Sequence, residues 1–264
     1  DKFMPVELHS TELGDANERK LLLLHGLMGS SRNWLMVARA LSERFHVHVL
    51  DLRNHGQSPW ADSMSWEALS SDLAHYTERA FSGRPFCLLG HSLGGKCAMH
   101  FATHYPKQVE KLVVVDIAAK LYPPHFKKEF EALLRLPISK LKNRQEGFEL
   151  LEAAIPDRLF RESLLANLKR NVEGSGGGFI WQPNLQVLYD QLEVIRTNPL
   201  KEEDAFLKAV LLVQGEQSEF IQSADHSQMR SHFPQLNFQC IKGAGHNPHI
   251  DQKEALVELL MNWL

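Results

Sequence analysis

Residues Leu88–Gly95 read Leu-Leu-Gly-His-Ser-Leu-Gly-Gly and form the most informative stretch of the sequence. Its serine, Ser92, stands between Gly90 and Gly94, directly after an apolar run and before a segment with helical spacing. A strand that turns sharply into a helix at a serine is a nucleophile elbow, in which the residues two before and two after must be small for the turn to close. The helix N-terminus behind the serine favours developing negative charge. We therefore interpret Ser92 as a nucleophile; the alternative is a glycine-rich turn with an incidental serine.

Apolar runs of strand length alternate with segments of helical spacing along most of the chain. Continuous Val and Leu runs are typical of parallel strands that are buried on both faces. The alternation predicts the α/β class, with a mostly parallel, doubly wound sheet that binds ligands at the carboxyl ends of its strands. Pro5–Leu13 alternates and predicts an antiparallel edge strand. The expected core strands are Lys20–His25, His46–Leu52, Phe86–Gly90, Lys111–Ile117, Lys208–Gln214 and Leu236–Lys242.

One block, residues 120–204, has helical patterns but no convincing strand. We interpret it as a helical cap, or lid, inserted between two core strands and lying over the strand ends, with residues 1–119 and 205–264 as the core. The alternative is a helical segment packed elsewhere on the core. Gly174–Gly178 predicts a flexible stretch, and the apolar, β-prone Phe179–Trp181 follows it. The apolar faces of the expected helices are Phe126, Phe130, Leu133 and Leu134, and Leu159, Leu164, Leu165 and Leu168.

The composition narrows the function classes. The chain has 264 residues and a net charge of −3 without a long run of one sign, which argues against nucleic-acid binding and a polybasic membrane anchor. Its apolar runs are too short for stable membrane insertion. The N-terminal DKFMPVELHS does not resemble a signal peptide, and its lack of an initiator Met is compatible with removal of a tag or leader. Three widely spaced cysteines favour a reducing compartment, so we expect a cytoplasmic protein.

A serine nucleophile needs a general base, and the chain offers 14 histidines. His246 ends the sequence Gly-Ala-Gly-His, between the last expected strand and the last helix, so its loop returns to the carboxyl end of the sheet. We predict that His246 is the base, with His249 as its competitor. A metal site at these two histidines is disfavoured, because no cysteine or carboxylate cluster accompanies them.

A third residue should orient the imidazole and stabilise its cation. Asp116 stands at the end of an apolar strand that has no structural use for a charge, and an unpaired buried carboxylate is costly. We predict Asp116 as this acid. The alternatives are Glu219 and Glu216, which follow the next strand, where Ser218 occupies the place expected for an aspartate.

The oxyanion that forms during acyl transfer needs two backbone N–H donors. One should come from Leu93, which follows the nucleophile. The loop after the first core strand should supply the other, from Leu27. His25 in that loop is expected to be structural.

At this point the chain resembles an α/β-hydrolase over nearly its whole length. The resemblance narrows to a branch of small bacterial esterases related to the α/β-hydrolase domain-containing esterases, which implies activity on acyl esters and acyl-CoA thioesters. In that branch the acid follows the strand after the nucleophile helix, as Asp116 does, whereas many other members have an aspartate at the position of Ser218. The motifs that carry the resemblance are HGLMGS (His25–Ser30), DLRNHGQS (Asp51–Ser58), GHSLGG (Gly90–Gly95), VVVDIA (Val113–Ala118) and GAGH (Gly243–His246).

The acyl pocket is expected to involve Met28 and Trp34, which lie near the oxyanion loop, and Trp181 of the cap. Three further aromatic residues, Tyr122, Phe126 and Phe130, are also candidates for the pocket. For these three and for Trp181, a place in the core of the cap is the better interpretation than a place in the pocket wall. Arg53, Asn54 and His55 are expected to hold their loop rather than to bind substrate.

The sequence thus predicts a serine hydrolase that cleaves a small-molecule acyl ester, or an acyl thioester, through an acyl-enzyme. No metal or organic cofactor is needed, and no particular oligomeric state is predicted. One alternative is carbon–carbon bond hydrolysis or other chemistry on the same triad, which an arginine-rich cap facing Ser92 would favour. A more distant one is a ligand receptor that has kept the fold without catalysis.

Overall fold

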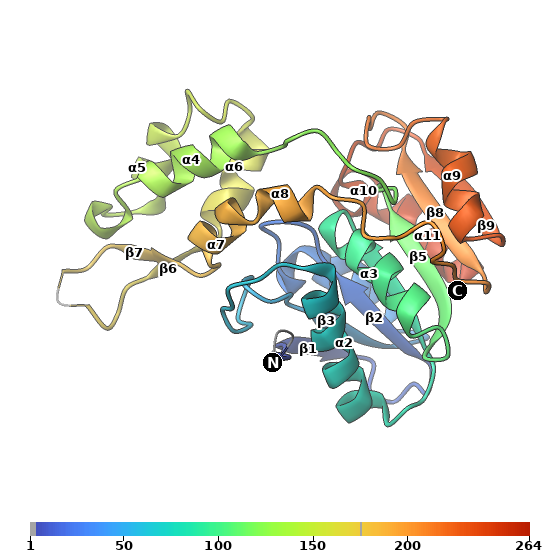
Figure 1. The fold of residues 1–264 in the computed structure, drawn as a ribbon. Helices are drawn as coiled ribbons and strands as arrows, with labels where there is room; N and C mark the ends of the chain where they lie inside the picture. Colours follow the sequence, from blue (N-terminus) through green and yellow to red (C-terminus); the bar gives the residue numbers. More distant parts are fainter. Residues whose placement is uncertain (1–3, 175) are drawn as a thin grey trace.

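The computed structural model describes residues 4–174 and 176–264. Seven strands form one sheet in the order β1-β3-β2-β4-β5-β8-β9, in which β1 is antiparallel to β3 and the other neighbours are parallel (Figure 1). This arrangement confirms the predicted α/β fold with its mostly parallel sheet. The strands are β1 (Ser10–Leu13), β2 (Lys20–Leu24), β3 (His46–Leu50), β4 (Phe86–His91), β5 (Val109–Val115), β8 (Val210–Gly215) and β9 (Leu236–Ile241).

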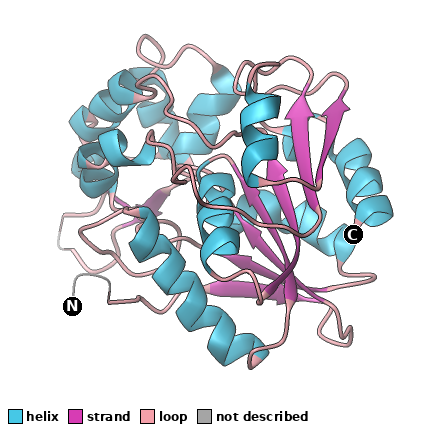
Figure 2. Ribbon diagram, turned by 45° about the vertical axis from the view of Figure 1, so that its right-hand side comes forward, coloured by secondary structure: helices cyan, strands magenta, loops and turns pink. Residues whose placement is uncertain are grey.

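Helices cover both faces of the sheet because its buried strands are apolar on both sides (Figure 2). Successive leucines of β2 point into different cores: Leu21 and Leu23 belong to one cluster, and Leu22 and Leu24 belong to the other. The first cluster includes side chains of α1 (Leu35–Leu41) and α11 (Lys253–Trp263). The second includes side chains of α2 (Trp66–Phe81), α3 (Leu93–His104) and α9 (Asp225–His232). Within the described residues, no helix is both long and apolar enough to span a membrane.

The N-terminal edge strand is shorter than predicted, since only Ser10–Leu13 of the segment Pro5–Leu13 pairs with β3. In residues 5–9, two backbone N–H groups find side-chain acceptors instead of strand partners. Val6 N–H donates to Asp72 Oδ1 (2.9 Å), and His9 N–H donates to Ser58 Oγ (2.9 Å). Two predicted segments lie partly outside the described residues. They are the N-terminal DKFMPVELHS, of which residues 1–3 are not described, and Gly174–Gly178, of which Ser175 is not described.

The regular structure between β5 and β8 is mainly helical, but it also contains a two-stranded antiparallel sheet that was not predicted. Its strands are β6 (Leu168–Arg170) and β7 (Phe179–Trp181). Leu168 was expected on a helical face, but α6 ends at Leu165 and Leu168 begins β6. The Asn167 side chain donates to the carbonyl of Met28 (2.9 Å), which fixes the chain between the two elements. The remaining elements are α4 (Lys127–Arg135), η2 (Ile138–Lys140), α5 (Arg144–Leu150), α6 (Arg158–Leu165), α7 (Leu185–Asp190) and α8 (Leu192–Ile195).

Candidate active site

Ser92 occupies a strained turn between β4 and α3. Its backbone has φ 54° and ψ −119°, a conformation that a non-glycine residue rarely adopts. The turn closes only because the residues two positions before and after Ser92 are glycines. A Cβ on Gly90 would lie 2.0 Å from the carbonyl oxygen of Gly94. A Cβ on Gly94 would lie 2.5 Å from the carbonyl oxygens of Leu24 and His25. The geometry is that of a nucleophile elbow.

His246 lies beside this serine. Its Nε2 is 3.0 Å from Ser92 Oγ, and its Nδ1 is 2.7 Å from Asp116 Oδ2. The three residues follow β9, β4 and β5, which bring them to the carboxyl end of the sheet from distant parts of the chain. A base within hydrogen-bond reach of the hydroxyl, itself oriented by a carboxylate, is the arrangement that activates a serine.

Asp116 is fully buried, and the surrounding chain satisfies its carboxylate. Its Oδ1 accepts from Gly215 N–H (3.0 Å), and its Oδ2 accepts from the Ser218 hydroxyl as well as from His246. Ser218 therefore holds the acid. Glu216 and Glu219, the alternative acids, are exposed, and the Glu216 carboxylate instead accepts from Gly243 N–H (2.9 Å).

His249, the competing base, is packed inside the protein. Its ring stacks on Trp34 with centroids 4.2 Å apart, and burial lowers its pKa to about 3. Two other side chains hold His246 at the serine. Phe220 stacks on its ring at 3.7 Å, and His91 Nε2–H donates to its carbonyl oxygen (2.7 Å). Burial lowers the pKa of His91 well below its usual value, which keeps that ring neutral.

The two expected oxyanion donors come from different elements, Leu27 from the loop after β2 and Leu93 from the start of α3. Leu27 and Leu93 line the same cavity as Ser92. Leu93 opens α3, so its N–H is one of the four that an α-helix leaves without an intrahelical partner. A Cβ on Gly26 would lie 3.3 Å from Ser92 Cβ, which shows how closely the loop approaches.

Two neutral histidines tie this loop to the chain that follows β3. His25 Nδ1–H donates to the carbonyl of Gly26 (2.7 Å), while its Nε2 accepts from Leu52 N–H (3.0 Å). His55 Nε2 accepts from Met28 N–H (3.1 Å). Burial lowers the pKa of both rings, that of His55 to about 3. Neutral rings are required here because each accepts a backbone hydrogen bond.

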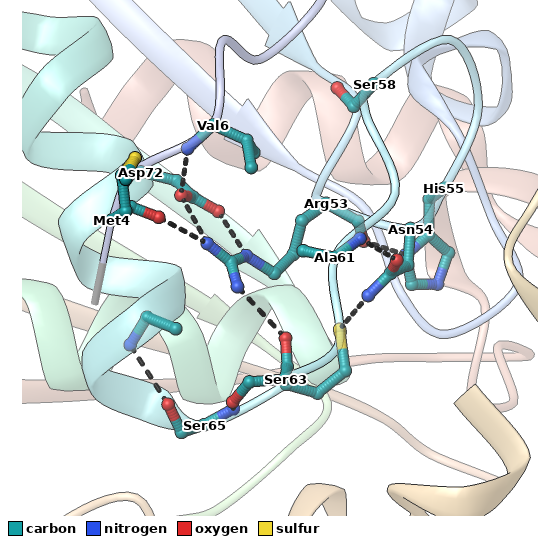
Figure 3. Close-up of polar contacts among 12 residues, drawn as sticks. Met4, Val6, Arg53, Asn54, His55, Ser58, Ala61, Ser63, Ser65 and Asp72 are labelled. Atoms are coloured by element: carbon teal, nitrogen blue, oxygen red, sulfur yellow. Dashed lines mark hydrogen bonds and ion pairs between the residues drawn. The ribbon is translucent and has the colours of Figure 1, made fainter. Parts of the chain in front are cut away.

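Polar side chains hold the loop after β3 to itself and to α2, as expected (Figure 3). The Arg53 guanidinium forms two hydrogen bonds with the Asp72 carboxylate (2.7 and 2.8 Å) and donates to the carbonyl of Ser63 (3.1 Å). Asn54 Oδ1 accepts from Ala61 N–H (2.8 Å). The partners of Arg53 and Asn54 lie in the loop itself, on α2 and, through Asn184 Nδ2–H (3.1 Å to Asn54 Oδ1), in the segment before α7, which agrees with a structural role.

A cavity of about 320 Å³ opens in front of Ser92. Its walls are mainly apolar and come from the core and from the segment between β5 and β8, with Leu27, Ile117, Tyr122, Phe126, Leu192 and Phe220 among them.

The structure differs from the predicted acyl pocket at three residues. Trp34 does not line the cavity, because it is fully buried between His249 and the core around α1. Trp181 does not line the cavity either. It packs from β7 against the core cluster that contains Leu22 and Leu24. Met28 lines a smaller adjoining pocket with Phe126 and Phe130.

The family model described as alpha/beta hydrolase fold matches residues 20–253. The chain is an α/β-hydrolase. It is 34% identical over 259 residues to the sn-1-specific diacylglycerol lipase ABHD11 of Mus musculus, covering 95% of this chain and 82% of that protein. It is 28% identical to the esterase YbfF of Escherichia coli, with 94% of each chain covered. A solved structure of a marine microorganism esterase superposes with a TM-score of 0.93 at 32% identity and covers 98% of this chain and 100% of that one. The predicted family and fold are confirmed, and a hydrolase acting on esters is supported.

One residue of the hydrolase's cavity had no predicted role at the site. Lys96 is buried on α3, and its ammonium donates to the carbonyls of Ile195, Arg196 and Thr197 (3.4, 3.1 and 2.8 Å) at the end of α8. Burial lowers its pKa to about 7. A lysine one turn after the elbow serine was visible in the sequence, but its acceptors lie 99 to 101 residues further along the chain.

Proposed function

We propose that this α/β-hydrolase cleaves carboxylic esters through an acyl-enzyme, with Ser92 as nucleophile, His246 as general base and Asp116 as the orienting acid. The observation that carries the proposal is the continuous relay from Ser92 Oγ to His246 Nε2 (3.0 Å) and from His246 Nδ1 to Asp116 Oδ2 (2.7 Å). The names of its relatives, a diacylglycerol lipase and two esterases, point to the same reaction.

In this mechanism His246 Nε2 removes the hydroxyl proton while Ser92 Oγ attacks the acyl carbonyl. The backbone N–H groups of Leu27 and Leu93 stabilise the oxyanion. His246 then protonates the leaving alcohol, and a water activated by the same ring releases the acid. Asp116 keeps the proton on Nδ1, so that Nε2 is free to accept.

The cavity favours a neutral acyl chain. Two of its cationic groups are already engaged: Arg196 Nε pairs with Glu193 (2.8 Å), and Lys96 bonds three carbonyls. The carbon–carbon hydrolase alternative needs a lining in which positive charge prevails, to hold an anionic substrate. Lys127 also lines this cavity, but the carboxylates of Asp190 and Glu193 line it as well, so the ester reading is preferred. We further propose that the segment 120–204 acts as the cap over this cavity, since Tyr122, Phe126 and Leu192 form part of its wall. A thioester has the same carbonyl and places the same demands on the site, so it is included in the test.

The experiment compares hydrolysis of p-nitrophenyl acetate, butyrate and octanoate, and of one acyl-CoA, by the wild type and Ser92→Ala. Ser163→Ala, on the exposed surface of α6, is the matched control. We expect Ser92→Ala to lower kcat by at least about 10⁴-fold and the control to leave it unchanged. Ester turnover by Ser92→Ala at the wild-type rate would refute the proposal. Tight binding of esters without turnover by the wild type would favour the receptor alternative.

A further inference from the structure

A second group of chemically active side chains lies on the sheet edge, outside the catalytic machinery. His46 and His48 are on β3, and Glu12 is on β1 directly opposite His48 in the register. Residues i and i+2 of a strand point to the same face, and so do directly opposed residues of an antiparallel pair. His46 is the first residue of β3, so the group lies toward the amino ends of the strands, away from Ser92.

The three side chains converge. His46 Nε2 is 2.9 Å and His48 Nε2 is 3.9 Å from Glu12 Oε2, and the three potential ligand atoms lie within 4.8 Å of one another. Ligand atoms around a tetrahedral zinc, at about 2.0 to 2.2 Å from the metal, are about 3.3 to 3.5 Å apart. The observed distances of 2.9 and 3.9 Å lie on either side of this spacing, so small side-chain rotations would bring the three ligand atoms into tetrahedral positions around one metal ion.

His48 supplies the observation that points to a ligand. The residue is only 2% exposed, yet its Nε2 has no hydrogen-bond partner in the part of the chain that the structure describes. Its Nδ1 lies 2.6 Å from Tyr76 Oη, which leaves Nε2 with a lone pair when Nδ1 carries the proton. A buried polar atom without a partner is uncommon and destabilising, and a bound cation would satisfy it.

We propose that Glu12, His46 and His48 form a binding site for a divalent transition-metal cation of the zinc class, with water in the fourth position. Two imidazoles and one carboxylate suit such a cation. The Glu12 side chain is 49% exposed, so the site is open to solvent on one side. The Tyr76 hydroxyl would orient His48 through Nδ1, as the outer partners of metal-bound histidines commonly do.

Lys20 opposes metal binding and therefore provides a directional test. Its Nζ lies 2.9 Å from His46 Nδ1. A metal on Nε2 requires the proton on Nδ1, which can then no longer accept from the ammonium. Lys20 must swing away on its flexible stem before the cation is bound. Removing its charge should tighten binding.

The experiment titrates protein purified without a histidine tag with Co²⁺, followed by the visible absorption of four-coordinate cobalt, and then displaces the cobalt with Zn²⁺. The variants are His48→Gln and Lys20→Met. The matched control is His75→Gln, which removes a histidine that also pairs with a glutamate, Glu7 (2.8 Å), but that belongs to no three-ligand group among the described residues. Circular dichroism of each metal-free variant checks that it is folded.

We expect stoichiometric cobalt absorption in the wild type and in His75→Gln, loss of the band in His48→Gln, and binding roughly tenfold tighter in Lys20→Met. Zn²⁺ at a hundred times its Kd should raise the wild-type Tm by about 5 to 10 °C and leave that of His48→Gln unchanged. Absence of the cobalt band, or equal binding by folded His48→Gln, would overturn the proposal. The metal site and the ester hydrolysis proposed above are tested by separate readouts, so either can fail alone.

Discussion

Replacing Asp116 by asparagine should disable the hydrolase without unfolding it. The two side chains have the same shape, and the amide oxygen can still accept from Gly215 N–H, which donates to Oδ1 at 3.0 Å. The second oxygen is different, because it accepts from His246 at 2.7 Å. An amide NH₂ in that place donates to Nδ1 and moves the ring proton to Nε2, where it faces Ser92. The base can then no longer take the serine proton.

The size of the effect follows from two contributions. The imidazolium formed in the transition state loses its carboxylate partner, and two unit charges about 4 Å apart at an effective dielectric constant of 20 interact by about 4 kcal/mol. That is a factor of about 10³ in rate. The unproductive tautomer adds to it, so kcat should fall by about 10⁴-fold in total, in line with the effect of the same change in other serine hydrolases.

The assay is kcat and KM on p-nitrophenyl butyrate, with Tm as the check on folding. Glu219→Gln and Glu216→Gln are the controls, and we expect each to stay within about twofold of the wild type because both side chains are exposed. Adding Ser218→Asp to Asp116→Asn should recover part of the rate, because Ser218 Oγ already contacts the carboxylate that holds His246. Retention of more than a tenth of the activity by Asp116→Asn, or an equally large loss in Glu219→Gln, would exclude Asp116 as the orienting acid.

Three further substitutions test other parts of the structure. Burial holds the pKa of His55 near 3 against 6.5 in the unfolded chain, so below pH 6.5 the unfolded state binds a proton that the native state refuses. His55→Gln should therefore flatten the fall of the unfolding free energy between pH 5.5 and 4.5 by about 1.4 kcal/mol per pH unit in urea titrations; an unchanged slope contradicts this. Gly90→Ala should destabilise by at least about 3 kcal/mol, because its Cβ would lie 2.0 Å from a carbonyl oxygen, whereas Gly176→Ala, with no atom within 4 Å, should leave Tm nearly unchanged. Lys96→Met leaves the carbonyls at the end of α8 unpaired and should lower stability by about 2 kcal/mol and raise KM more than it lowers kcat; an unaltered Tm and KM would exclude this role.

The core strands and the elbow were predictable because their signals are local. Four consecutive leucines in β2 and the run of valines in β5 leave little choice but a strand buried on both faces. Gly90 and Gly94 around Ser92 encode the sharp turn directly. The positions of His246 and Asp116 follow from the rule that parallel strands bring their carboxyl ends to one edge.

The pocket was less predictable because side-chain direction depends on tertiary packing. Trp34 lies close to the oxyanion loop in sequence, but the 3₁₀ turn Ser31–Trp34 directs its ring into the core against His249. The pair His46 and His48 is visible in the sequence as alternate residues. Its partner Glu12 emerges only from the register of β1 against β3, and the predicted edge strand Pro5–Leu13 did not specify that register.

The segment that we propose as the cap lies in one long connection between two strands that are neighbours in the sheet, β5 and β8. A parallel pair requires only a connection long enough to return the chain to the starting edge, and everything beyond that length is unconstrained by the sheet. Asp116 is the first residue of this connection, directly after β5, and Ser92 and His246 lie outside it. The proposed cap is therefore an exchangeable cassette: its length and sequence can vary without displacing Ser92, His246 or Asp116, and such a change would alter which molecules enter the cavity.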